Sequence, residues 1–306
     1  MLWQSDVVIS HRFTYKLHMT YKIDGKEVSS YIKECLKKEV QKLDIKPCLA
    51  VVLVGSNPAS ISYVSSKKKT CEELGFSHRD IDLDETVSQD DLISVIEDLN
   101  RDDNVDGILV QLPLPRHIDS DMIIKKILPE KDVDGFTPIN MGRLVLGQEC
   151  FIPCTPKGIL ALLDYYKIDT DGKKVVVVGR SNIVGKPIAN LLMQKDRNAT
   201  VTVCNTHTKD LKKECLEADI LIAACGQREA IKGDMVKDGA VVIDVGINRV
   251  DDPSRERGWR LVGDCDYNAL KDKVTAITPV PGGVGPMTIA MLMENTLIAF
   301  KRRRGL

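Results

Sequence analysis

The apolar residues in the first part of the chain recur with helical spacing. They fall four apart, at Val28, Ile32, Leu36 and Val40. Lysines and glutamates separate them, which predicts an amphipathic helix over residues 24–43. A continuous valine-rich run follows at residues 49–54 and ends at Gly55, as expected for a buried strand of a parallel sheet.

The pattern continues through the first half of the chain. It predicts helices over residues 60–74 and 91–99 and a strand over residues 105–112, with the first of these helices ending at Gly75. This alternation is typical of an open α/β domain. Residues 113–156 are rich in proline and glycine and carry little periodicity, which indicates a functional segment or a domain junction.

The second half of the chain alternates more regularly. The predicted strands cover residues 174–178, 200–204, 220–224 and 241–245. Helices are predicted over residues 158–166, from Pro187 onward, and over residues 287–302. Because 306 residues exceed the usual size of one core, we predict two domains: an N-terminal open α/β domain and a C-terminal Rossmann-like nucleotide-binding domain.

Composition narrows the range of partners. The formal net charge of −1 favours a small-molecule ligand over nucleic acid or an anionic membrane surface. No apolar run reaches the length of about 18 residues that predicts a transmembrane helix. The nine cysteines are scattered and form no Cys-x-x-Cys pair, so we expect free thiols in a reducing compartment and no metal site.

The first 22 residues fit two interpretations. They contain Arg12, Lys16 and Lys22 but a single acid, Asp6, a bias found in mitochondrial leaders. Met19 stands just before the first globular segment, so residues 1–18 equally fit a dispensable extension.

A glycine turn joins the valine strand to the helix that contains Pro187. Residues 179–185 begin and end with glycine, which allows close approach of backbone to a ligand, and free N–H groups at the helix start can bind phosphate. A P-loop for ATP or GTP is disfavoured, because the glycine spacing is one residue too long and Pro187 replaces the magnesium-binding Ser or Thr. A tight turn without a ligand is the remaining alternative.

The end of the next strand bears on the choice of nucleotide. An NAD site normally has an acid there to bind the ribose hydroxyls, whereas residues 204–208 contain none. Arg180 can grip a 2′-phosphate, and Ser181 and Thr206 supply hydroxyl groups. This favours NADP, and His207 fits a surface turn better than a ligand-binding role.

Candidate chemistry in the first domain begins on the helix at residues 60–74. Tyr63 and Lys67 lie four residues apart and therefore face the same way. A tyrosine ring can stack on a flat heterocycle, and a lysine in a dry pocket can lose its proton near neutral pH. The alternative is a solvated lysine face, because Lys68 and Lys69 follow directly.

Three other segments supply polar groups. Gln111 ends an apolar strand, where an α/β fold places its ligand site, and Asp134 in a glycine-closed loop can accept hydrogen bonds from an aminopyrimidinone edge. Asp132 in the same loop also fits a turn-forming role. Residues 278–286 hold three glycines and three prolines, as in a loop that closely approaches a ligand.

Together these motifs resemble the bifunctional methylenetetrahydrofolate dehydrogenase/methenyltetrahydrofolate cyclohydrolase family, of the FolD type, over residues 21–300. The matching segments are Tyr63-Val64-x-x-Lys67, residues 110–115, residues 129–135, Gly179-Arg180-Ser181-x-Ile183-Val184-Gly185 and residues 279–288.

The resemblance implies roles for single residues. Lys67 is the main catalytic residue, Gln111 sets its protonation state, Tyr63 stacks on the folate and Asp134 holds the pterin. The other implied substrate-binding residues are Val110, Leu112, Pro281, Gly282, Gly283 and Val284. The implied cofactor-binding residues are Gly179, Arg180, Ser181, Ile183, Thr206 and Ile247. Some relatives carry Arg at the position of Thr206, and some NAD-using relatives keep the Gly-Arg-Ser turn.

The resemblance also implies an organisation and a reaction. Residues 1–20 form an extension, residues 21–150 with a returning helix at 286–304 bind folate, and residues 151–285 bind NADP. In one cleft between the domains, 5,10-methylenetetrahydrofolate is oxidised to the methenyl form, which is hydrolysed to 10-formyltetrahydrofolate. A homodimer formed through the nucleotide-binding domain is expected.

The expected location is cytoplasmic, or mitochondrial if residues 1–18 act as a leader. Two alternatives to the bifunctional enzyme stay open: an NAD-linked relative with dehydrogenase activity alone, and a catalytically silent nucleotide-binding protein.

Overall fold

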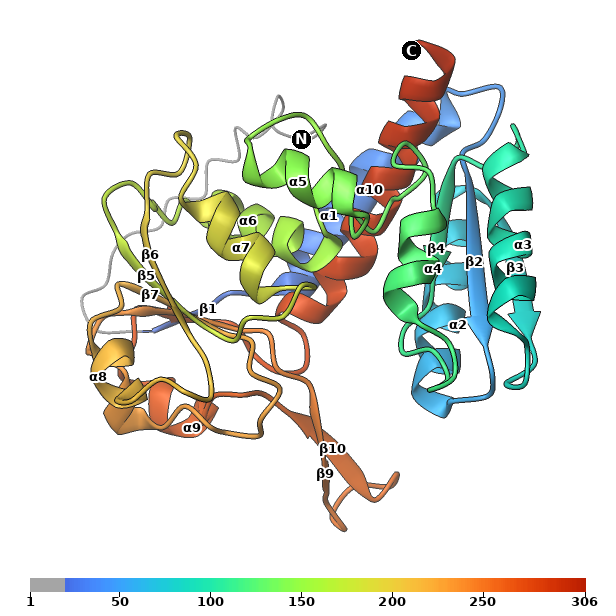
Figure 1. Cartoon of the computed structure of the whole chain (residues 1–306). Coiled ribbons are helices and arrows are strands. Elements are labelled where there is room, and N and C mark those ends of the chain that lie inside the picture. The colour runs from blue at the N-terminus through green and yellow to red at the C-terminus, as the bar shows by residue number, and fades with distance from the viewer. Residues whose placement is uncertain (1–19) are drawn as a thin grey trace. The chain divides into compact units, whose positions relative to one another are not determined.

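The computed structural model describes residues 20–306, which divide into two units (Figure 1). The first unit contains residues 20–29 and 155–288, and the second contains residues 30–154 and 289–306. The helices α1 (Gly25–Gln41) and α10 (Val284–Arg304) each run from one unit into the other. Except for Thr20, the extension expected at residues 1–20 lies outside the described residues.

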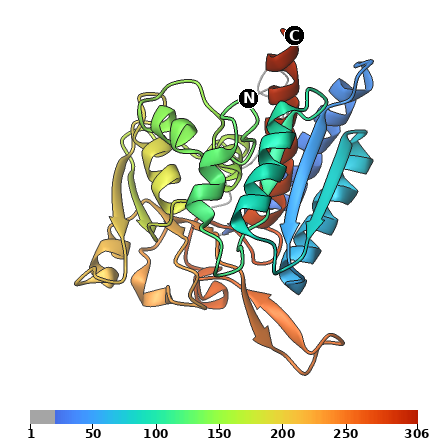
Figure 2. The same cartoon turned by 45° about the vertical axis from the view of Figure 1, so that its right-hand side comes forward.

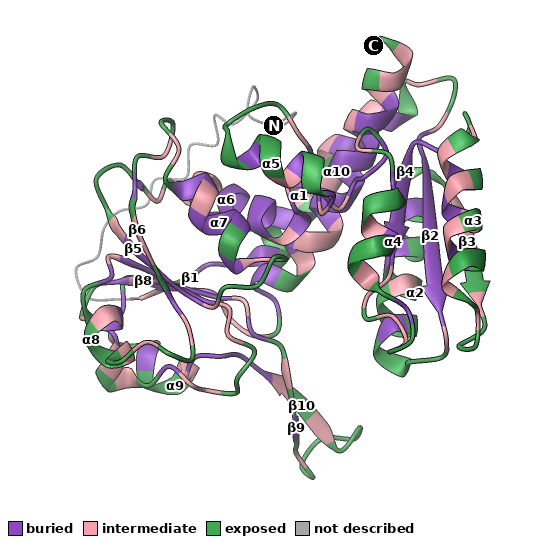
Figure 3. Ribbon diagram, viewed as in Figure 1, coloured by how far each residue is buried: buried purple, intermediate pink, exposed green. Residues whose placement is uncertain are grey.

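The second unit is built on a three-stranded parallel sheet. Its strands β2 (Cys48–Val54), β3 (Ser77–Leu83) and β4 (Gly107–Val110) lie in the order β3-β2-β4. All seven residues of the central strand β2 are buried (Figure 3). A strand covered on both faces has no polar side, which explains its unbroken apolar run and confirms the strand predicted there.

Helices cover both faces of this sheet (Figures 1 and 2). Alternate side chains of β2, such as Val52, pack with apolar residues of α3 (Gln89–Arg101) and α4 (Ser120–Lys126). On the other side α2 (Pro58–Leu74) contacts α10, where the Cys71 sulfur lies 3.6 Å from that of Met293. The predicted return of the last helix is observed, because residues 289–306 of α10 belong to this unit.

Helix α2 carries the first candidate site residues, and its ends follow from local sequence. The Asn57 side chain accepts hydrogen bonds from the N–H groups of Ala59 and Ser60, and Pro58 occupies the first turn, where a missing N–H costs little. Gly75 ends the helix in the left-handed conformation, with φ of 78°. The predicted end at Gly75 is confirmed, and the helix begins two residues earlier than predicted because Asn57 caps it.

Two features of the second unit differ from the sequence predictions. Strand β3 was not predicted, because it is a half-exposed edge strand whose charged residues obscure its periodicity. The segment expected to be irregular contains α4 and α5 (Pro138–Val145), which are too short to show a helical period. Side-chain caps from Asp119 and Thr137 define where these helices begin.

The first unit contains a six-stranded sheet in which every adjacent pair is parallel, in the order β1-β11-β8-β7-β5-β6. Its strands are β1 (Tyr21–Lys22), β5 (Lys174–Val178), β6 (Thr200–Cys204), β7 (Ile220–Ala223), β8 (Val241–Asp244) and β11 (Ala276–Ile277). The four predicted strands are all observed. Residues 21–22 pair with β11 of this sheet, although they were expected in the folate-binding domain. The two strands lie far apart in the chain, so no local sequence pattern predicts their pairing.

Helices lie on both faces of the six-stranded sheet (Figure 1). On one face are α6 (Cys154–Tyr165) and α7 (Gly185–Leu192); on the other are α8 (Leu211–Leu216) and α9 (Tyr267–Leu270). Strand β5 is flanked by β6 on one side and β7 on the other. In doubly wound sheets such a reversal of strand order marks the ligand site, just beyond the carboxyl ends of the strands.

An antiparallel hairpin of β9 (Asn248–Asp251) and β10 (Trp259–Val262) projects from the first unit (Figure 1). The guanidinium groups of Arg249 and Arg257 lie 4.7 and 4.1 Å from the ring centre of Trp259. No pattern in the sequence predicted this hairpin, because its strands are short and rich in charged residues.

All nine cysteines are free thiols, and six of them are buried. Within residues 20–306, none of the helices combines the length and the apolar character needed to cross a membrane.

Candidate active site

Lys67 lies on the buried side of α2. The residue is only 9% exposed, and its Nζ donates a hydrogen bond to Gln111 Oε1 at 2.8 Å. The next two lysines are not buried: Lys68 forms an ion pair with Asp80 at 3.1 Å, and Lys69 is exposed. The alternative of a solvated lysine face is therefore wrong for Lys67. Tyr63, one turn earlier on the helix, is exposed and available for stacking.

The amide of Gln111 is oriented by its own backbone. Gln111 directly follows β4, and its Nε2 donates to the carbonyl oxygen of Leu112 at 2.6 Å. Because the amide nitrogen is engaged there, the amide oxygen faces Lys67. This arrangement gives the amine a hydrogen-bond acceptor that carries no charge.

The loop that contains Asp134 is held by its two preceding polar residues. The buried Nζ of Lys131 donates to the carbonyl oxygens of Leu99, Asn100 and Asp102 at 2.9, 2.8 and 2.7 Å, at the end of α3. These bonds satisfy carbonyls that a helix end leaves without partners.

Asp132 forms the turn itself. Its carboxylate accepts the N–H groups of Gly135 at 3.0 Å, Phe136 at 3.2 Å and Thr137 at 2.8 Å, which confirms the turn-forming interpretation. Asn140 Nδ2 donates to the same carboxylate at 2.8 Å. With Lys131 and Asp132 engaged in structure, Asp134 is the residue of this motif left to face a ligand.

Helix α10 secures the same loop from another direction. Asn295 Nδ2 donates to the carbonyl oxygens of Val133 at 2.8 Å and Ile152 at 3.0 Å. The peptide before Asp134 is thus tied to the last helix, which gives the loop a fixed position within the second unit.

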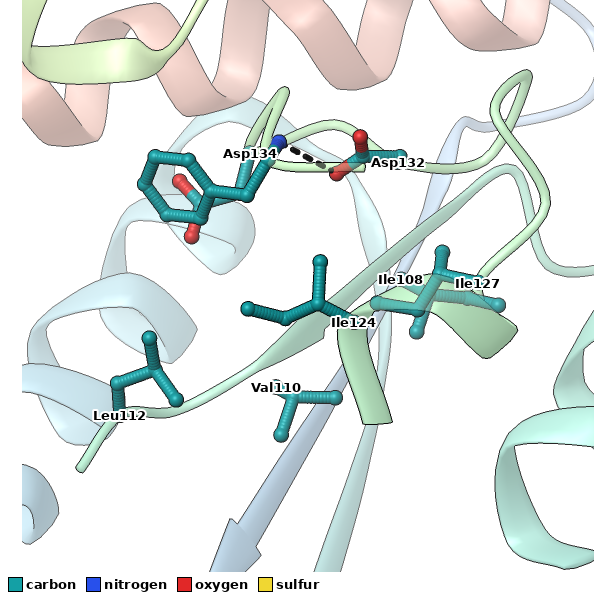
Figure 4. Close-up of a pocket in the computed structure, with 8 residues that line it drawn as sticks. Ile108, Val110, Leu112, Ile124, Ile127, Asp132 and Asp134 are labelled. Atoms are coloured by element: carbon teal, nitrogen blue, oxygen red, sulfur yellow. Dashed lines mark hydrogen bonds between the residues drawn. The ribbon is translucent and has the colours of Figure 1, made fainter. Parts of the chain in front are cut away.

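A recess opens beside Asp134 (Figure 4). It is lined by Ile108, Val110, Leu112, Ile124, Ile127, Asp132, Asp134 and Phe136. The Asp132 carboxylate accepts the backbone N–H of Phe136, and the aliphatic side chains labelled in Figure 4 form the walls of the recess. Apolar walls with a few polar groups suit a flat heterocycle that carries hydrogen-bond donors.

Burial changes the pKa values of both Lys67 and Asp134. It lowers the pKa of the Lys67 ammonium, an effect that the negative charge of Asp134 opposes. It raises the pKa of the Asp134 carboxyl, and the positive charge of Lys67 opposes that shift. A lysine whose pKa is lowered can exchange protons nearer to neutral pH than a solvated one.

In the first unit, the glycine turn lies at the carboxyl end of β5, beside the reversal of strand order. Gly179 has φ of +127°, and a Cβ there would overlap the carbonyl oxygen of Ala224. A Cβ on Gly185 would overlap the carbonyl oxygen of Gly179. Glycine is therefore required at both ends because backbone packs against backbone.

Ser181 has a structural role that the sequence analysis missed. Its Oγ accepts the N–H groups of Val184 at 3.1 Å and Gly185 at 3.4 Å, at the start of α7. These two N–H groups are therefore engaged, contrary to the expectation that the helix start offers free donors to phosphate. The hydroxyl proton of Ser181 and the exposed Arg180 and Ile183 remain available.

The turn after β6 leaves one hydroxyl exposed. Asn205 Oδ1 accepts the N–H of His207 at 2.9 Å, and Thr208 Oγ1 accepts the N–H of Asn205 at 2.9 Å. Thr206 and His207 are exposed, so His207 is the surface turn residue that was expected. The turn contains no carboxylate to repel a 2′-phosphate, and its composition fits NADP.

The proline- and glycine-rich loop lies in the first unit, from Pro281 to the start of α10. Gly282 has φ of +107°, and a Cβ on Gly283 would approach the carbonyl oxygen of Pro279 to 2.6 Å. Ile247 lies beside this loop, with its Cδ1 3.7 Å from the position of a Cβ on Gly285.

The candidate residues thus form two groups. Tyr63, Lys67, Val110, Gln111, Leu112 and Asp134 belong to the second unit. Gly179, Arg180, Ser181, Ile183, Thr206, Ile247, Pro281, Gly282, Gly283 and Val284 belong to the first. Sequence reasoning missed Asn140 and Asn295, because an asparagine that binds a distant carbonyl or carboxylate leaves no local signal.

A doubly wound sheet with a glycine turn at its strand reversal, and a second unit with a buried lysine, define a nucleotide-dependent α/β enzyme. Residues 23–134 match the catalytic domain of tetrahydrofolate dehydrogenase/cyclohydrolase. Residues 153–304 match the NAD(P)-binding domain of the same enzymes. The chain belongs to the tetrahydrofolate dehydrogenase/cyclohydrolase family.

Individual relatives are similar over nearly their whole length. The bifunctional protein FolD of Chlorobium phaeobacteroides strain BS1 is 55% identical over 288 residues, which are 92% of this chain and 97% of the relative. The crystal structure of the bifunctional FolD methylenetetrahydrofolate dehydrogenase/cyclohydrolase of Campylobacter jejuni is 51% identical, with a TM-score of 0.89 over 93% of this chain and 99% of its own. The Trypanosoma brucei FolD, whose structure was determined with NADP and an inhibitor, is 38% identical, with a TM-score of 0.88 over 94% and 99%.

Proposed function

We propose that this protein oxidises 5,10-methylenetetrahydrofolate to 5,10-methenyltetrahydrofolate with NADP and hydrolyses the methenyl form to 10-formyltetrahydrofolate. The observation that carries the proposal is the buried Lys67–Gln111 hydrogen bond of 2.8 Å, in the unit that also holds Asp134. The buried Lys131 ammonium donates to three backbone carbonyl oxygens and holds a loop, whereas the buried Lys67 ammonium is bonded to a side-chain amide, so donors remain for a ligand.

The oxidation needs positioning more than acid–base chemistry. NADP bound by the first unit would supply a hydride acceptor, and loss of hydride from the carbon bridging N5 and N10 would leave an amidinium cation on the folate. The protein binds and orients the reactants, an effect that can reach about 7–11 kcal/mol in well-aligned reactions. In this proposal Tyr63 stacks on the folate, Asp134 accepts hydrogen bonds from its pyrimidine edge, and Ile247 and residues 281–284 border the nicotinamide side.

The hydrolysis assigns proton transfers to Lys67. Water adds to the cationic carbon, forming a C–O bond, and the neutral amine of Lys67 takes one proton of that water. The C–N5 bond then breaks as N5 receives the proton back from Lys67. The second water proton passes to solvent as the formyl C=O forms. Gln111 accepts a hydrogen bond from the amine throughout and keeps it oriented toward the substrate.

The assignment of cofactor residues rests on the first unit. Arg180 and Thr206 are both exposed, one in the glycine turn and the other in the turn after β6. A guanidinium group can bind a 2′-phosphate with two hydrogen bonds. Ser181 contributes its hydroxyl proton, and Gly179 and Ile183 shape the turn.

The two domain roles follow the same division. Residues 30–154 with residues 289–306 bind folate, and residues 155–288 bind the nucleotide. These proposed limits follow the two structural units and differ from the expected ones, which were residues 21–150 with 286–304 and residues 151–285.

We further propose a homodimer formed through the first unit. Within residues 20–306, β6 is an edge strand of the six-stranded sheet, and its Val203 is 40% exposed. Met193, just after α7, is 54% exposed. An uncovered edge with apolar side chains invites pairing with another chain.

We place the protein in the cytoplasm. A leader in residues 1–18 is the alternative. Fusing residues 1–18 to a fluorescent protein separates the two: a diffuse signal supports the cytoplasm, and a mitochondrial signal overturns it.

A coupled assay tests the reaction. Purified protein is mixed with methylenetetrahydrofolate and either NADP or NAD, and reduced nucleotide and methenyl product are followed by absorbance. We expect faster initial rates with NADP and little accumulation of methenyl product. Faster oxidation with NAD and full accumulation would instead identify an NAD-linked dehydrogenase that lacks the hydrolase step.

A further inference from the structure

Two buried carboxylates that the proposed mechanism does not use join the loops at the carboxyl end of the six-stranded sheet. Asp244 is the last residue of β8, and Asp264 follows β10. Asp244 is 3% exposed and Asp264 is fully buried. Neither carboxylate has an ion-pair partner among the described residues. Each accepts hydrogen bonds from N–H groups and also interacts with a thiol, that of Cys225 for Asp264 and that of Cys265 for Asp244.

Asp264 binds segments that follow two different strands. Its Oδ2 accepts the backbone N–H groups of Cys225 and Gly226, each at 2.8 Å, just beyond β7. Its Oδ1 accepts Asn248 Nδ2 at 3.0 Å, at the start of the hairpin. One side chain therefore connects the loop after β7 with the loop after β8.

Asp244 holds the segment that follows β8 and the segment that follows β10. Its Oδ1 accepts the N–H groups of Gly246 and Asp264, each at 2.9 Å, and its Oδ2 accepts that of Cys265 at 2.9 Å. The carboxylates also pack directly on glycine. A Cβ on Gly246 would overlap the Asp264 carboxylate, and a Cβ on Gly263 would overlap that of Asp244.

These bonds hold the two residues that flank the exposed Ile247. Gly246 is held by Asp244 and Asn248 by Asp264, so Ile247 is fixed on both sides while it remains 46% exposed. Its Cδ1 lies beside the first turn of α10 near Gly285. Ile247 is the residue that we place at the nicotinamide, so both anchors act on the reacting end of the cofactor site.

The choice of carboxylates carries a cost, because each places a charge in a buried site. Burial raises the pKa of Asp244 to about 6, and the nearby Asp264 adds to that shift. Each carboxylate accepts three hydrogen bonds, which neutral side chains of this size cannot do with one oxygen facing each loop. The gain is rigidity in the loops that follow β7 and β8.

We infer that Asp264 is a positioning residue for hydride transfer: through Asn248 it holds Ile247, and through Cys225 and Gly226 it holds the adjacent loop, against the nicotinamide end of the nucleotide. The inference rests on the proposed function. It assigns Asp264 no contact with the substrate or the cofactor.

Exchanging the two partners tests this inference. Asn248→Asp places a half-buried carboxylate against the buried carboxylate of Asp264. The double variant Asn248→Asp/Asp264→Asn restores one donor and one acceptor, with their positions exchanged. In the double variant the amide oxygen introduced at position 264 still accepts from Cys225 and Gly226. Such a cycle isolates the pair from other effects of each change.

For Asn248→Asp we expect kcat of the dehydrogenase to fall about tenfold or more, with a smaller change in KM for NADP, because Asp264 keeps its bonds to Cys225 and Gly226, next to the glycine turn, in this variant. The methenyl hydrolysis rate should stay within about twofold, since the proton transfers assigned to Lys67 involve neither Asn248 nor Asp264. The double variant should recover dehydrogenase activity to within about threefold of the wild type.

Control variants complete the design. Asp251→Asn, an exposed change on the same strand, should leave both activities unchanged. If Asn248→Asp does not fold, as judged by its thermal unfolding, Asn248→Ala replaces it and should lower kcat about threefold.

Two results would overturn the inference. One is wild-type dehydrogenase activity in Asn248→Asp, or in Asn248→Ala if that variant carries the test. The other is an equal loss of both activities that the double variant does not rescue. Absence of dehydrogenase activity in the wild-type protein would instead refute the proposed function.

Discussion

At the scale of single residues, the environment of one amine separates Lys67 from its neighbours. Lys67, Lys68 and Lys69 are adjacent in sequence, yet Lys67 alone is buried against Gln111. Helical geometry turns successive side chains by about 100°, so adjacent lysines meet different surroundings. The chemical difference among the three therefore arises from where the helix packs.

Removing this amine should separate the two activities. Lys67→Met is expected to lower methenyl hydrolysis by about a hundredfold or more, because no other group at that position can transfer the protons. Oxidation should fall less, since it depends on positioning. Hydrolysis is measured as loss of methenyl absorbance and oxidation as formation of NADPH. Lys69→Met is the matched control, and full hydrolysis by Lys67→Met would contradict the assignment.

The pH dependence of hydrolysis should report the acidity of Lys67. Because burial lowers its pKa from 10.5, the neutral amine forms at lower pH than in a solvated lysine. The enzymatic rate should therefore rise with pH and reach its midpoint below 10.5, after subtraction of the uncatalysed rate. Lys67→Arg, which stays protonated, should lack this rise. An identical profile for both proteins would argue against proton transfer by Lys67.

At the scale of elements, sequence patterns predicted the buried strands well and the edges poorly. Strand β2 was predicted because all of its residues are buried, whereas β3 was missed because half-exposed edge strands tolerate charge. Helices α4 and α5 were missed because a helix of seven or eight residues shows barely two turns of periodicity. The glycine turn was located correctly, yet the use of Ser181 as a cap for α7 required coordinates.

The glycine turn makes its own prediction. A Cβ at position 185 would overlap the carbonyl oxygen of Gly179, so Gly185→Ala must move backbone. We expect a higher KM for NADP and a loss of about 1–3 kcal/mol in stability, measured by initial rates and thermal unfolding. Gly142→Ala is the control, because no atom lies within 4 Å of its Cβ position. Unchanged KM and stability in Gly185→Ala would show that the turn can adapt.

At the scale of the whole molecule, the chain assembles each unit from separated segments. Residues 20–29 join residues 155–288, and residues 289–306 join residues 30–154. The bond from Asn295 to Val133 and the pairing of β1 with β11 are consequences of this interleaving. Both link residues more than 130 positions apart, and neither leaves a trace in local periodicity.

The proposed homodimer gives a prediction at this scale. Val203→Asp places a charge on the exposed face of β6, where pairing with a second chain would bury it at a cost of several kcal/mol. Light scattering after size exclusion should give twice the chain mass for the wild type and the mass of one chain for the variant. Thr202→Val on the same strand is the control. A wild-type protein that elutes as a monomer would end the proposal.

Local sequence patterns were enough to predict the α/β class, the buried strands and the glycine turn, because burial and turn geometry restrict residue type locally. The motifs shared with the folate enzymes were also recognised from the sequence. The tertiary structure decided which of those residues have free side chains. Lys131, Asp132 and Ser181 are engaged in holding loops, while Lys67 and Asp134 alter each other's acidity within one unit. Hydrogen bonds and burial between segments far apart in the chain set these roles. Such contacts depend on how the segments pack, so a local sequence pattern does not predict them.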